Sequence, residues 1–284
     1  MNNFVKAHGL GNEYIVLDNA EIDFSLTAEL IQKICNVHYG IGSDGILLKV
    51  PSNKADFGLR IFNPDGSEAE KSGNGLRIFS KYLFDYSHTT YDKFTIETPG
   101  GLVTSEIIEK KNLKAFMIKV DMGKAIFIAK NIPVTFPKEE CFGEELFVED
   151  KKFMIHCVSV GNPHCVILTD ALNDAETRKY GPIIENLPMF PNRINVQFAK
   201  VINRKLVEIR IWERGTGYTL ASGSSSSAVA CAMIKKGLTD RNLTIQMPGG
   251  TLKIEVDEDW SIHMTGEVRE VGYGVLSEEL VRTY

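Results

Sequence analysis

The rest of the sequence is interpreted from one stretch, Asn63-Pro-Asp-Gly-Ser-Glu-Ala-Glu-Lys-Ser-Gly-Asn-Gly-Leu-Arg77. In it a polar, glycine-rich turn leads directly into an apolar segment with helical periodicity. The pattern predicts a helix over about 73–86 with Ser72 at its N-terminus, and Gly73 and Gly75 leave space around that serine. Read alone, this is a capping serine after a tight turn, although a helix start of this kind can also hold a carboxylate.

The same plan recurs in the second half of the chain at a nearly constant spacing. Gly11-Asn12 matches Gly161-Asn162, Arg60-Ile61-Phe62 matches Arg210-Ile211-Trp212, and Ser72-Gly73 matches Ser222-Gly223, each at an offset of 150 residues, while Pro99-Gly100-Gly101 matches Pro248-Gly249-Gly250 at 149. Four blocks in order hold one register, so the sequence predicts an internal duplication with a pseudo-twofold relation.

The fold class predicted from this duplication is α+β, with two pseudo-symmetric domains of mixed strands and helices. Short strands outnumber helices along the chain. We place the N-terminal domain at residues 1–119 and the C-terminal domain at 120–284, and we allow the last strands to cross back to the first domain.

Composition narrows the class of protein. The chain has 284 residues, of which 43% are hydrophobic and 24% charged, which suits a water-soluble protein with two medium-sized cores. A net charge of -5 and the absence of a Lys/Arg stripe argue against nucleic acid as a partner. The N-terminus lacks a signal-peptide core and no apolar run reaches about 18 residues, so we expect a cytoplasmic protein without a membrane partner.

The five cysteines are odd in number and lack metal-ligand spacing, which predicts reduced, mostly buried thiols and no metal site.

Duplication of the helix start has a chemical consequence. If Ser72 and Ser222 each begin a helix and the pseudo-twofold points both N-termini into one cleft, two sets of free backbone N–H groups converge there. An α-carboxylate bound to them loses its α-proton more readily, because the developing negative charge falls on oxygens that are already hydrogen-bonded. Residues 72 and 222 would then act in two-base racemisation, one removing the proton and the other returning one to the opposite face.

Several motifs resemble the diaminopimelate epimerase family, in family order from residue 4 to about 275. They are His8-Gly9-Leu10-Gly11-Asn12, Asn63-Pro64-Asp65-Gly66-Ser67-Glu68-Ala69-Glu70, Gly73-Asn74-Gly75-Leu76-Arg77, Gly161-Asn162-Pro163-His164, Asn195-Val196, and Glu213-Arg214-Gly215 with Gly217. The resemblance implies an amino-acid epimerase that uses no pyridoxal phosphate or other cofactor, with two similar domains that close over a small amino-acid substrate. A homodimer is compatible with it.

The resemblance also implies roles for individual residues. His164 would help the base at residue 72, Glu213 would support a base, and Arg214 would grip the substrate's far carboxylate through its planar fork of donors. The other implied substrate-binding residues are Asn12, Asn63, Gly73, Asn74, Asn162, Asn195, Gly223 and Ser224. Without the resemblance, the adjacent Glu213 and Arg214 could be a solvated surface pair, His164 a turn cap, and the asparagines ordinary turn residues.

The sequence departs from the family at the two helix starts, where the family has cysteine and this chain has Ser72 and Ser222. A thiol becomes a usable thiolate at a helix N-terminus, whereas an alcohol is much harder to ionise. Neither Cys165 nor Cys231, nine residues beyond Ser222, is placed to substitute. Three accounts fit: a natural paralogue that uses the serines, a natural inactive amino-acid-binding homologue, or an epimerase whose cysteines were replaced deliberately.

The sequence also bears on two other classes of function, nucleotide binding and noncatalytic binding. Nucleotide binding is disfavoured, because Gly73-Asn74-Gly75 matches neither a dinucleotide-binding fingerprint nor a phosphate-binding loop. The second class is a noncatalytic binding or dimerisation module. Only a measurement of turnover distinguishes it from an epimerase.

Overall fold

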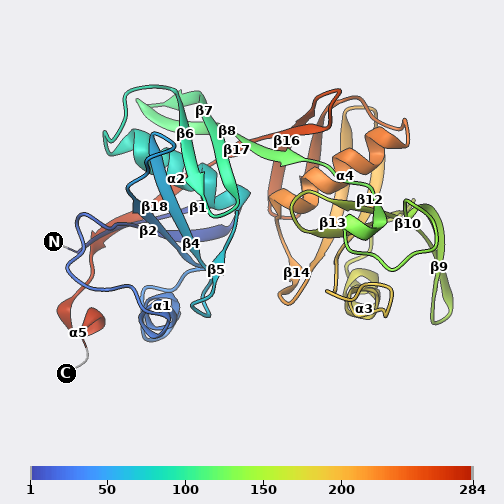
Figure 1. The fold of residues 1–284 in the computed structure, drawn as a ribbon, viewed down its shortest axis with the longest axis horizontal. Coiled ribbons are helices and arrows are strands. Elements are labelled where there is room, and N and C mark those ends of the chain that lie inside the picture. The colour runs from blue at the N-terminus through green and yellow to red at the C-terminus, as the bar shows by residue number, and fades with distance from the viewer. Residues whose placement is uncertain (1, 283–284) are drawn as a thin grey trace. The chain divides into compact units, whose positions relative to one another are not determined.

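A computed structural model describes residues 2–282. The chain forms two compact units, one built from the residues up to Val120 together with those from Gly266 onward, the other from Asp121–Thr265. The last long strand lies in the first unit because β18 (Arg269–Val275) pairs antiparallel with β1 (Asn3–Gly9). Figure 1 shows the chain passing from one unit to the other in β8 and returning in β17.

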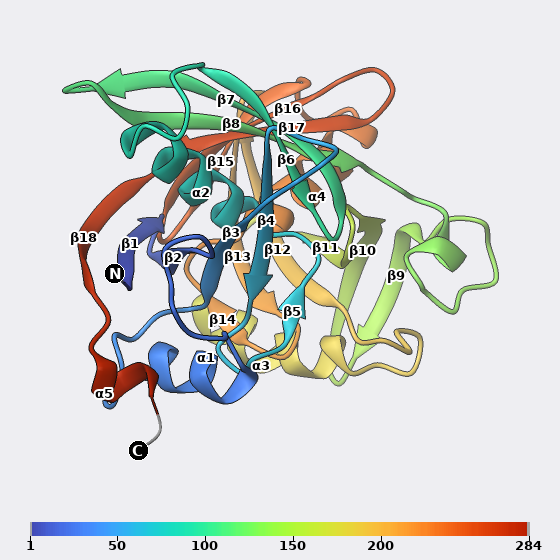
Figure 2. The ribbon, with the colours of Figure 1, turned by 60° about the vertical axis from the view of Figure 1, so that its left-hand side comes forward.

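The first unit contains strands on both sides of a long helix. Besides β1 and β18, its elements are β2 (Asn12–Asp18), α1 (Ala28–Cys35), β3 (Ile46–Val50), β4 (Phe57–Phe62), β5 (Glu68–Ala69), α2 (Gly73–Asp85), β6 (Lys93–Thr98), β7 (Gly101–Lys111), most of β8 (Lys114–Lys124) and α5 (Glu278–Val281). Figure 2 shows the long β7–β8 hairpin and the path of β18 towards α5.

The second unit repeats this order with an added N-terminal hairpin strand and a short 3-10 turn. Its elements are η1 (Ala129–Asn131), β9 (Phe142–Val148), β10 (Lys151–Ser159), β11 (Pro163–Leu168), α3 (Asp174–Glu185), β12 (Asn195–Asn203), β13 (Leu206–Glu213), β14 (Gly217–Thr219), α4 (Gly223–Lys235), β15 (Asn242–Met247), β16 (Gly250–Val256) and most of β17 (Ser261–Glu267).

Strand pairing in the two units agrees residue by residue. The parallel pair β2–β3 aligns Ile15 with Ile46, and the parallel pair β11–β12 aligns Cys165 with Val196, each partner being 150 residues further along. The antiparallel pairs β4–β5 and β13–β14 and the parallel pairs β4–β6 and β13–β15 repeat as well. The predicted α+β class and internal duplication are therefore confirmed.

The long helix of each unit is enclosed by strands. In α2 every residue from Gly73 to Leu83 is buried, against β1, β2 and β7, and α4 is buried against β10 to β13, β15 and β16. A helix that is covered on all sides has no polar face, which explains why α4 consists of small residues (Gly-Ser-Ser-Ser-Ser-Ala-Val-Ala-Cys-Ala) rather than an amphipathic pattern. Burial on all sides fixes the axis of each helix and hence the position of its N-terminus.

The two units have separate apolar cores. In the first, Ile15, Ile31, Ile34 and Ile46 bring together β2, α1 and β3. In the second, a core around β10 to β12 and α3 includes Cys157, Cys165, Ile184 and Val196. All five cysteines are free and buried.

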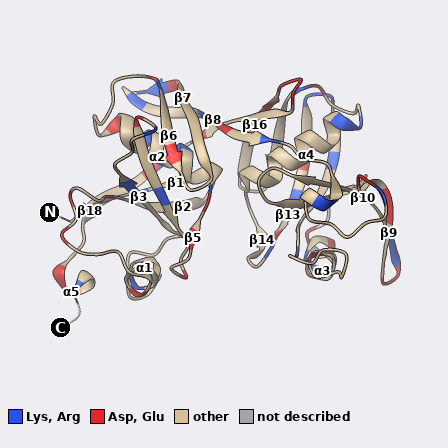
Figure 3. Cartoon of the chain, in the orientation of Figure 1, with Lys and Arg blue, Asp and Glu red and all other residues tan. Residues whose placement is uncertain are grey.

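Charged residues of both signs are interspersed along the elements of each unit (Figure 3). None of the helices formed by residues 2–282 has the length and apolarity that a membrane crossing requires.

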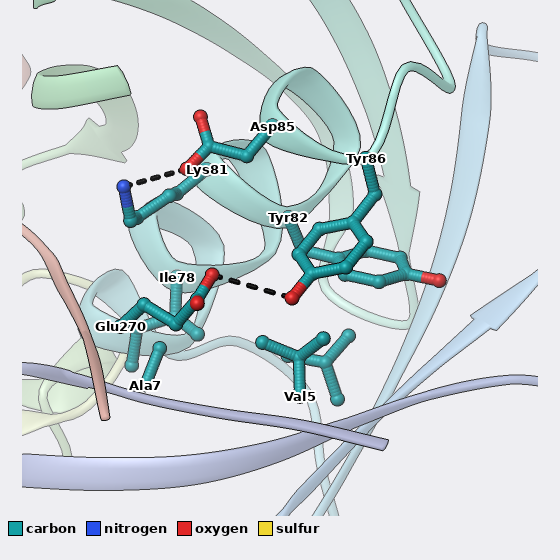
Figure 4. A pocket seen from close by; sticks show the side chains of 9 residues that line it. Val5, Ala7, Ile78, Lys81, Tyr82, Asp85, Tyr86 and Glu270 are labelled. Atoms are coloured by element: carbon teal, nitrogen blue, oxygen red, sulfur yellow. Dashed lines mark hydrogen bonds and ion pairs between the residues drawn. The ribbon is translucent and has the colours of Figure 1, made fainter. Parts of the chain in front are cut away.

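A buried ion pair ties α2 to the start of β8. The Lys81 ammonium lies 2.7 Å from Asp85 Oδ2 and 2.6 Å from the carbonyl oxygen of Ala115, whose own N–H donates to Asp85 Oδ1 at 2.8 Å. The Lys81 and Asp85 side chains are 8% and 0% exposed. Figure 4 shows this pair beside a small pocket under α2, where Tyr86 donates to Glu270.

Lys81→Met should destabilise the protein by about 3 kcal/mol, because it leaves the buried Asp85 carboxylate without its cation. The matched control is Lys152→Met, which breaks the half-exposed pair with Glu145 and should cost roughly 0.5 kcal/mol or less. Chemical denaturation of the three proteins measures both losses. Equal losses would show that the Lys81–Asp85 pair does not hold α2 in place.

Candidate active site

The first candidate half-site lies at the N-terminus of α2. Ser72 is the N-cap in extended conformation, and its Oγ accepts a hydrogen bond from the Gly75 N–H at 3.0 Å. A Cβ on Gly75 would lie 3.2 Å from Ser72 Oγ and 3.0 Å from Leu47 Cδ2, so glycine is what allows this close approach. The first-turn N–H groups before Gly75 have no partner within the helix and point toward the N-terminus, where they can bind an anion.

Two of the predicted asparagines lie together at this helix start. The amide of Asn74 donates to Asn12 Oδ1 at 3.0 Å, and Asn12 in turn donates to Asp44 Oδ2 at 2.9 Å. Asn74 itself accepts from the buried Arg77 guanidinium at 2.8 Å. Burial lowers the pKa of Arg77 to about 10, so the group is a cation at neutral pH. The row of bonds from Arg77 to Asp44 fixes the orientation of both asparagine side chains.

Asn63 is not part of this row. Its side chain donates to Ser67 Oγ at 3.0 Å, and its backbone N–H donates to the Ser67 carbonyl at 2.8 Å. Both bonds close the turn over residues 63–67, and the implied substrate-binding role of Asn63 stays a prediction.

The second candidate half-site lies at the N-terminus of α4. The Ser222 hydroxyl accepts from the Ser225 N–H at 3.4 Å and lies 3.4 Å from Ser224 Oγ. Asn162 donates to Ser224 Oγ at 3.5 Å. The Ser222 N–H is directed at the sulfur of Met247 at 3.4 Å. Ser222, Ser224 and Asn162 therefore form a cluster that corresponds to Ser72, Asn74 and Asn12 in the first unit.

His164 is fully buried behind this cluster. Its Nε2 lies 2.9 Å from Asn162 Oδ1. Burial lowers the pKa of His164 to about 3, and the Arg214 charge adds to this effect, while a hydrogen bond with Gln197 opposes it. The imidazole is therefore neutral at physiological pH. Within its own unit it orients Asn162, and its implied action on residue 72 stays a prediction.

Arg214 and Asn195 are joined through the backbone. Asn195 Oδ1 accepts from the Arg214 N–H at 3.0 Å, and its amide donates to the Pro163 carbonyl at 2.8 Å. The Arg214 guanidinium donates to the Asn192 carbonyl at 2.9 Å. Asn195 thus links the Arg214 turn to the Asn162-Pro163 loop. Glu213 ends β13 and is half-buried, beside Arg214 in the chain.

Some residues in these half-sites were not predicted from the sequence. Tyr14 on β2 places its hydroxyl 3.3 Å from Ser72 Oγ, and Gln197 donates to Ser225 Oγ at 3.0 Å. Asp44 and Met247 accept from Asn12 and from the Ser222 N–H, as described above. A signal for Tyr14 was present, because the offset of 150 that relates the repeats pairs it with His164. Asp44, Gln197 and Met247 carry no comparable motif.

The buried cysteines offer no substitute nucleophile at the helix starts. Cys231 is fully buried within α4, and burial raises the pKa of its thiol to about 12. Within residues 2–282 no group of three or more His, Cys, Asp or Glu side chains is arranged to hold a metal ion.

Solved structures with the same fold come from several proteins of low sequence identity. A hydroxyproline epimerase from Agrobacterium vitis superimposes with a TM-score of 0.72 at 12% identity, covering 96% of this chain and 90% of the other. A predicted epimerase from Pseudomonas aeruginosa does so with a TM-score of 0.67 at 17% identity, covering 97% and 99%. At these identities the comparison supports the duplicated fold.

Sequence comparison identifies the family more specifically than the fold does. The family model described as diaminopimelate epimerase matches residues 4–128 and 156–271. Diaminopimelate epimerase 2 from Nostoc sp. is 50% identical over 278 residues, 98% of this chain and 96% of its own length. Diaminopimelate epimerase from Leptospira biflexa is 41% identical over 273 residues, 96% of this chain and 98% of its own. These matches confirm the family resemblance and support an isomerase of the epimerase and racemase type. With both repeats matched, the chain belongs to the diaminopimelate epimerase family.

Proposed function

We propose that this protein inverts the α-carbon of a small amino acid without pyridoxal phosphate, and that the substrate is diaminopimelate or a similar dicarboxylic amino acid. The observation that carries the proposal is the pair of capped helix starts at Ser72 and Ser222, which occupy equivalent places in the two repeats. The family, and relatives whose names specify diaminopimelate epimerase, support the choice of reaction and substrate.

In the proposed reaction both helix starts act on one substrate. The free N–H groups at Gly73, Asn74, Gly223 and Ser224 hold the α-carboxylate and stabilise the enolate-like charge that forms as the α-proton leaves. Residues 72 and 222 exchange that proton on opposite faces of the α-carbon. The proposal of this step rests on the duplication and on the family resemblance. The step requires a serine hydroxyl on each face of the substrate's α-carbon.

The remaining residues are assigned by resemblance and by their contacts. Asn12, Asn162 and Asn195 bind the amino acid, with Asn63 in support, and Arg214 binds its far carboxylate. His164 and Glu213 assist the proton-transferring groups. His164 would do so as a neutral ring, because its pKa of about 3 excludes the imidazolium form near neutral pH. The expected homodimer stays a prediction.

The alternative is an amino-acid-binding homologue without turnover, either natural or made by Cys-to-Ser replacement. It is favoured by the alcohols at both helix starts, because an alcohol is a far weaker acid than a thiol.

Exchange of the α-hydrogen for solvent deuterium, measured on a panel of L- and D-amino acids, should be detectable for at least one dicarboxylic member. The double variant Ser72→Cys/Ser222→Cys should exchange the same member at least about 10²-fold faster, because thiolates ionise more readily at helix N-termini. Exchange by the cysteine variant alone would show that the serine protein is the inactive homologue. If neither protein exchanged the α-hydrogen of any panel member, the epimerase proposal would be wrong.

Ser72→Ala should abolish exchange of the enantiomer whose α-hydrogen faces residue 72, whereas Thr27→Ala should leave that exchange unchanged. Both substitutions remove an N-cap side chain, since Thr27 Oγ1 accepts from the Leu30 N–H at 3.3 Å, so each should cost about 1 kcal/mol of stability. Measuring unfolding and exchange together separates loss of the cap from loss of the chemistry. An equal loss of exchange in the two variants would mean that Ser72 acts only as a cap.

Arg214→Met should weaken binding of a dicarboxylic amino acid about 10- to 100-fold, as expected for a lost charge-assisted bond, and should leave binding of alanine unchanged. Arg210→Met is the matched control, because Arg210 lies on β13, four residues before Arg214, but pairs with Asp174. Titration calorimetry gives the Kd whether or not the protein turns over. A parallel loss for alanine and the dicarboxylate would remove Arg214 from the far-carboxylate role.

A further inference from the structure

Ser72 has a phenol as its neighbour. The Tyr14 hydroxyl lies 3.3 Å from Ser72 Oγ, and either oxygen can be the donor. The Tyr14 residue is 7% exposed, so its ring is enclosed and its oxygen is directed to the helix start. The proton of either hydroxyl can therefore lie between the two oxygens.

The surroundings fix this contact from both sides. Gly45 lies against the Tyr14 ring, where a Cβ would stand 2.8 Å from Tyr14 Cε1 and 2.3 Å from the Phe62 carbonyl oxygen. Ser72 is held by its capping bond from Gly75. A side chain at position 45 would clash first with the Phe62 carbonyl and then with the Tyr14 ring, so glycine is required there, and it leaves the room that the ring occupies.

The second repeat lacks this arrangement. The strand registers pair Ile15 with Ile46 and Cys165 with Val196, so His164 occupies the place of Tyr14, one residue before each aligned position. The His164 ring bonds to Asn162, and the hydroxyl that Ser222 Oγ contacts, at 3.4 Å, is that of Ser224. The two serines therefore differ in what can exchange a proton with them.

We propose that Tyr14 is the proton-carrying partner of Ser72, an inference that rests on the function proposed above. A serine alcohol alone is a poor base, whereas a tyrosine phenol ordinarily ionises near pH 10. In the step, the α-proton passes to Ser72 Oγ while the Ser72 hydroxyl proton passes to the Tyr14 phenolate. The C–H electron pair stays on the substrate, delocalised into its carboxylate. In the reverse direction the Tyr14 phenol supplies the proton through Ser72. Tyr14 never touches the substrate and is a positioning residue.

The asymmetry predicts which enantiomer depends on Tyr14. The enantiomer that presents its α-hydrogen to Ser72 needs the Tyr14 phenolate for proton removal, whereas the other enantiomer loses its α-hydrogen to Ser222. Exchange of the α-hydrogen for solvent deuterium should therefore depend on Tyr14 for one enantiomer and much less for the other.

The test compares Tyr14→Phe in two backgrounds. With Ser72 present, we expect Tyr14→Phe to slow α-hydrogen exchange of the enantiomer that faces Ser72 about 10²-fold, and to slow that of the other enantiomer much less. With Ser72→Cys, the same change should alter exchange less than about 3-fold, since a thiolate needs no phenol. Tyr218→Phe, which removes a hydroxyl bonded to Asp174 at 3.0 Å, is the control.

The outcomes are distinct. Loss of exchange by the same factor in the serine and cysteine backgrounds would overturn the proposal, because it would mark Tyr14 as structural. Unchanged exchange in Tyr14→Phe would overturn it while leaving the epimerase function intact. A parent protein that exchanges no panel member would overturn the proposed function and this inference together. Unfolding curves of Tyr14→Phe that match the parent exclude misfolding as the cause of a loss.

Discussion

The constraint on which the structure depends is the N-terminus of a helix that is buried on all sides. The first N–H groups of such a helix have no partner within it, and burying them without acceptors costs about 1–3 kcal/mol each. Ser72 and Ser222 each satisfy one of them, through bonds to Gly75 and Ser225. The proposed function assigns the other N–H groups at each helix start to the substrate carboxylate. The enclosure that fixes α2 and α4 therefore also creates a place for a carboxylate, and fold and candidate chemistry share one cause.

Because the fold is duplicated, a buried helix start occurs in each repeat. Different side chains surround it in the two repeats. In the first, a row of bonds from Arg77 through Asn74 and Asn12 reaches Asp44. In the second, Ser224 and Asn162 take the corresponding places, and the buried neutral His164 stands behind them. Since an α-carbon that carries four different substituents presents two unlike faces, identical half-sites are not required. What the repeats retain is the strand register and the capping serine, which set the geometry.

The sequence predicted these common features because each has a local signal. Capping serines, glycine turns and the offset of 150 residues are visible in one dimension, so the helix starts and the duplicated plan could be predicted. The partners of the serines could not, because they depend on packing between distant segments. Tyr14 and Ser72 are 58 residues apart, and their contact depends on Gly45, whose need for space appears only when β2, β3 and β4 are assembled. The same holds for Met247 beside Ser222.

Oxygen in place of the sulfur that the family resemblance implies would change both roles of the capping residue. A serine oxygen is a strong N-cap, worth about 1 kcal/mol, and at 3.0 Å from the Gly75 N–H it holds the helix start firmly. The helix dipole that lowers a thiol pKa into the working range cannot do the same for an alcohol, whose proton is held far more strongly. A serine at this position is therefore a good N-cap but a much weaker source of a base than a cysteine. If it is to exchange protons, a second group with an accessible pKa has to touch it, and at Ser72 the fold supplies a tyrosine hydroxyl.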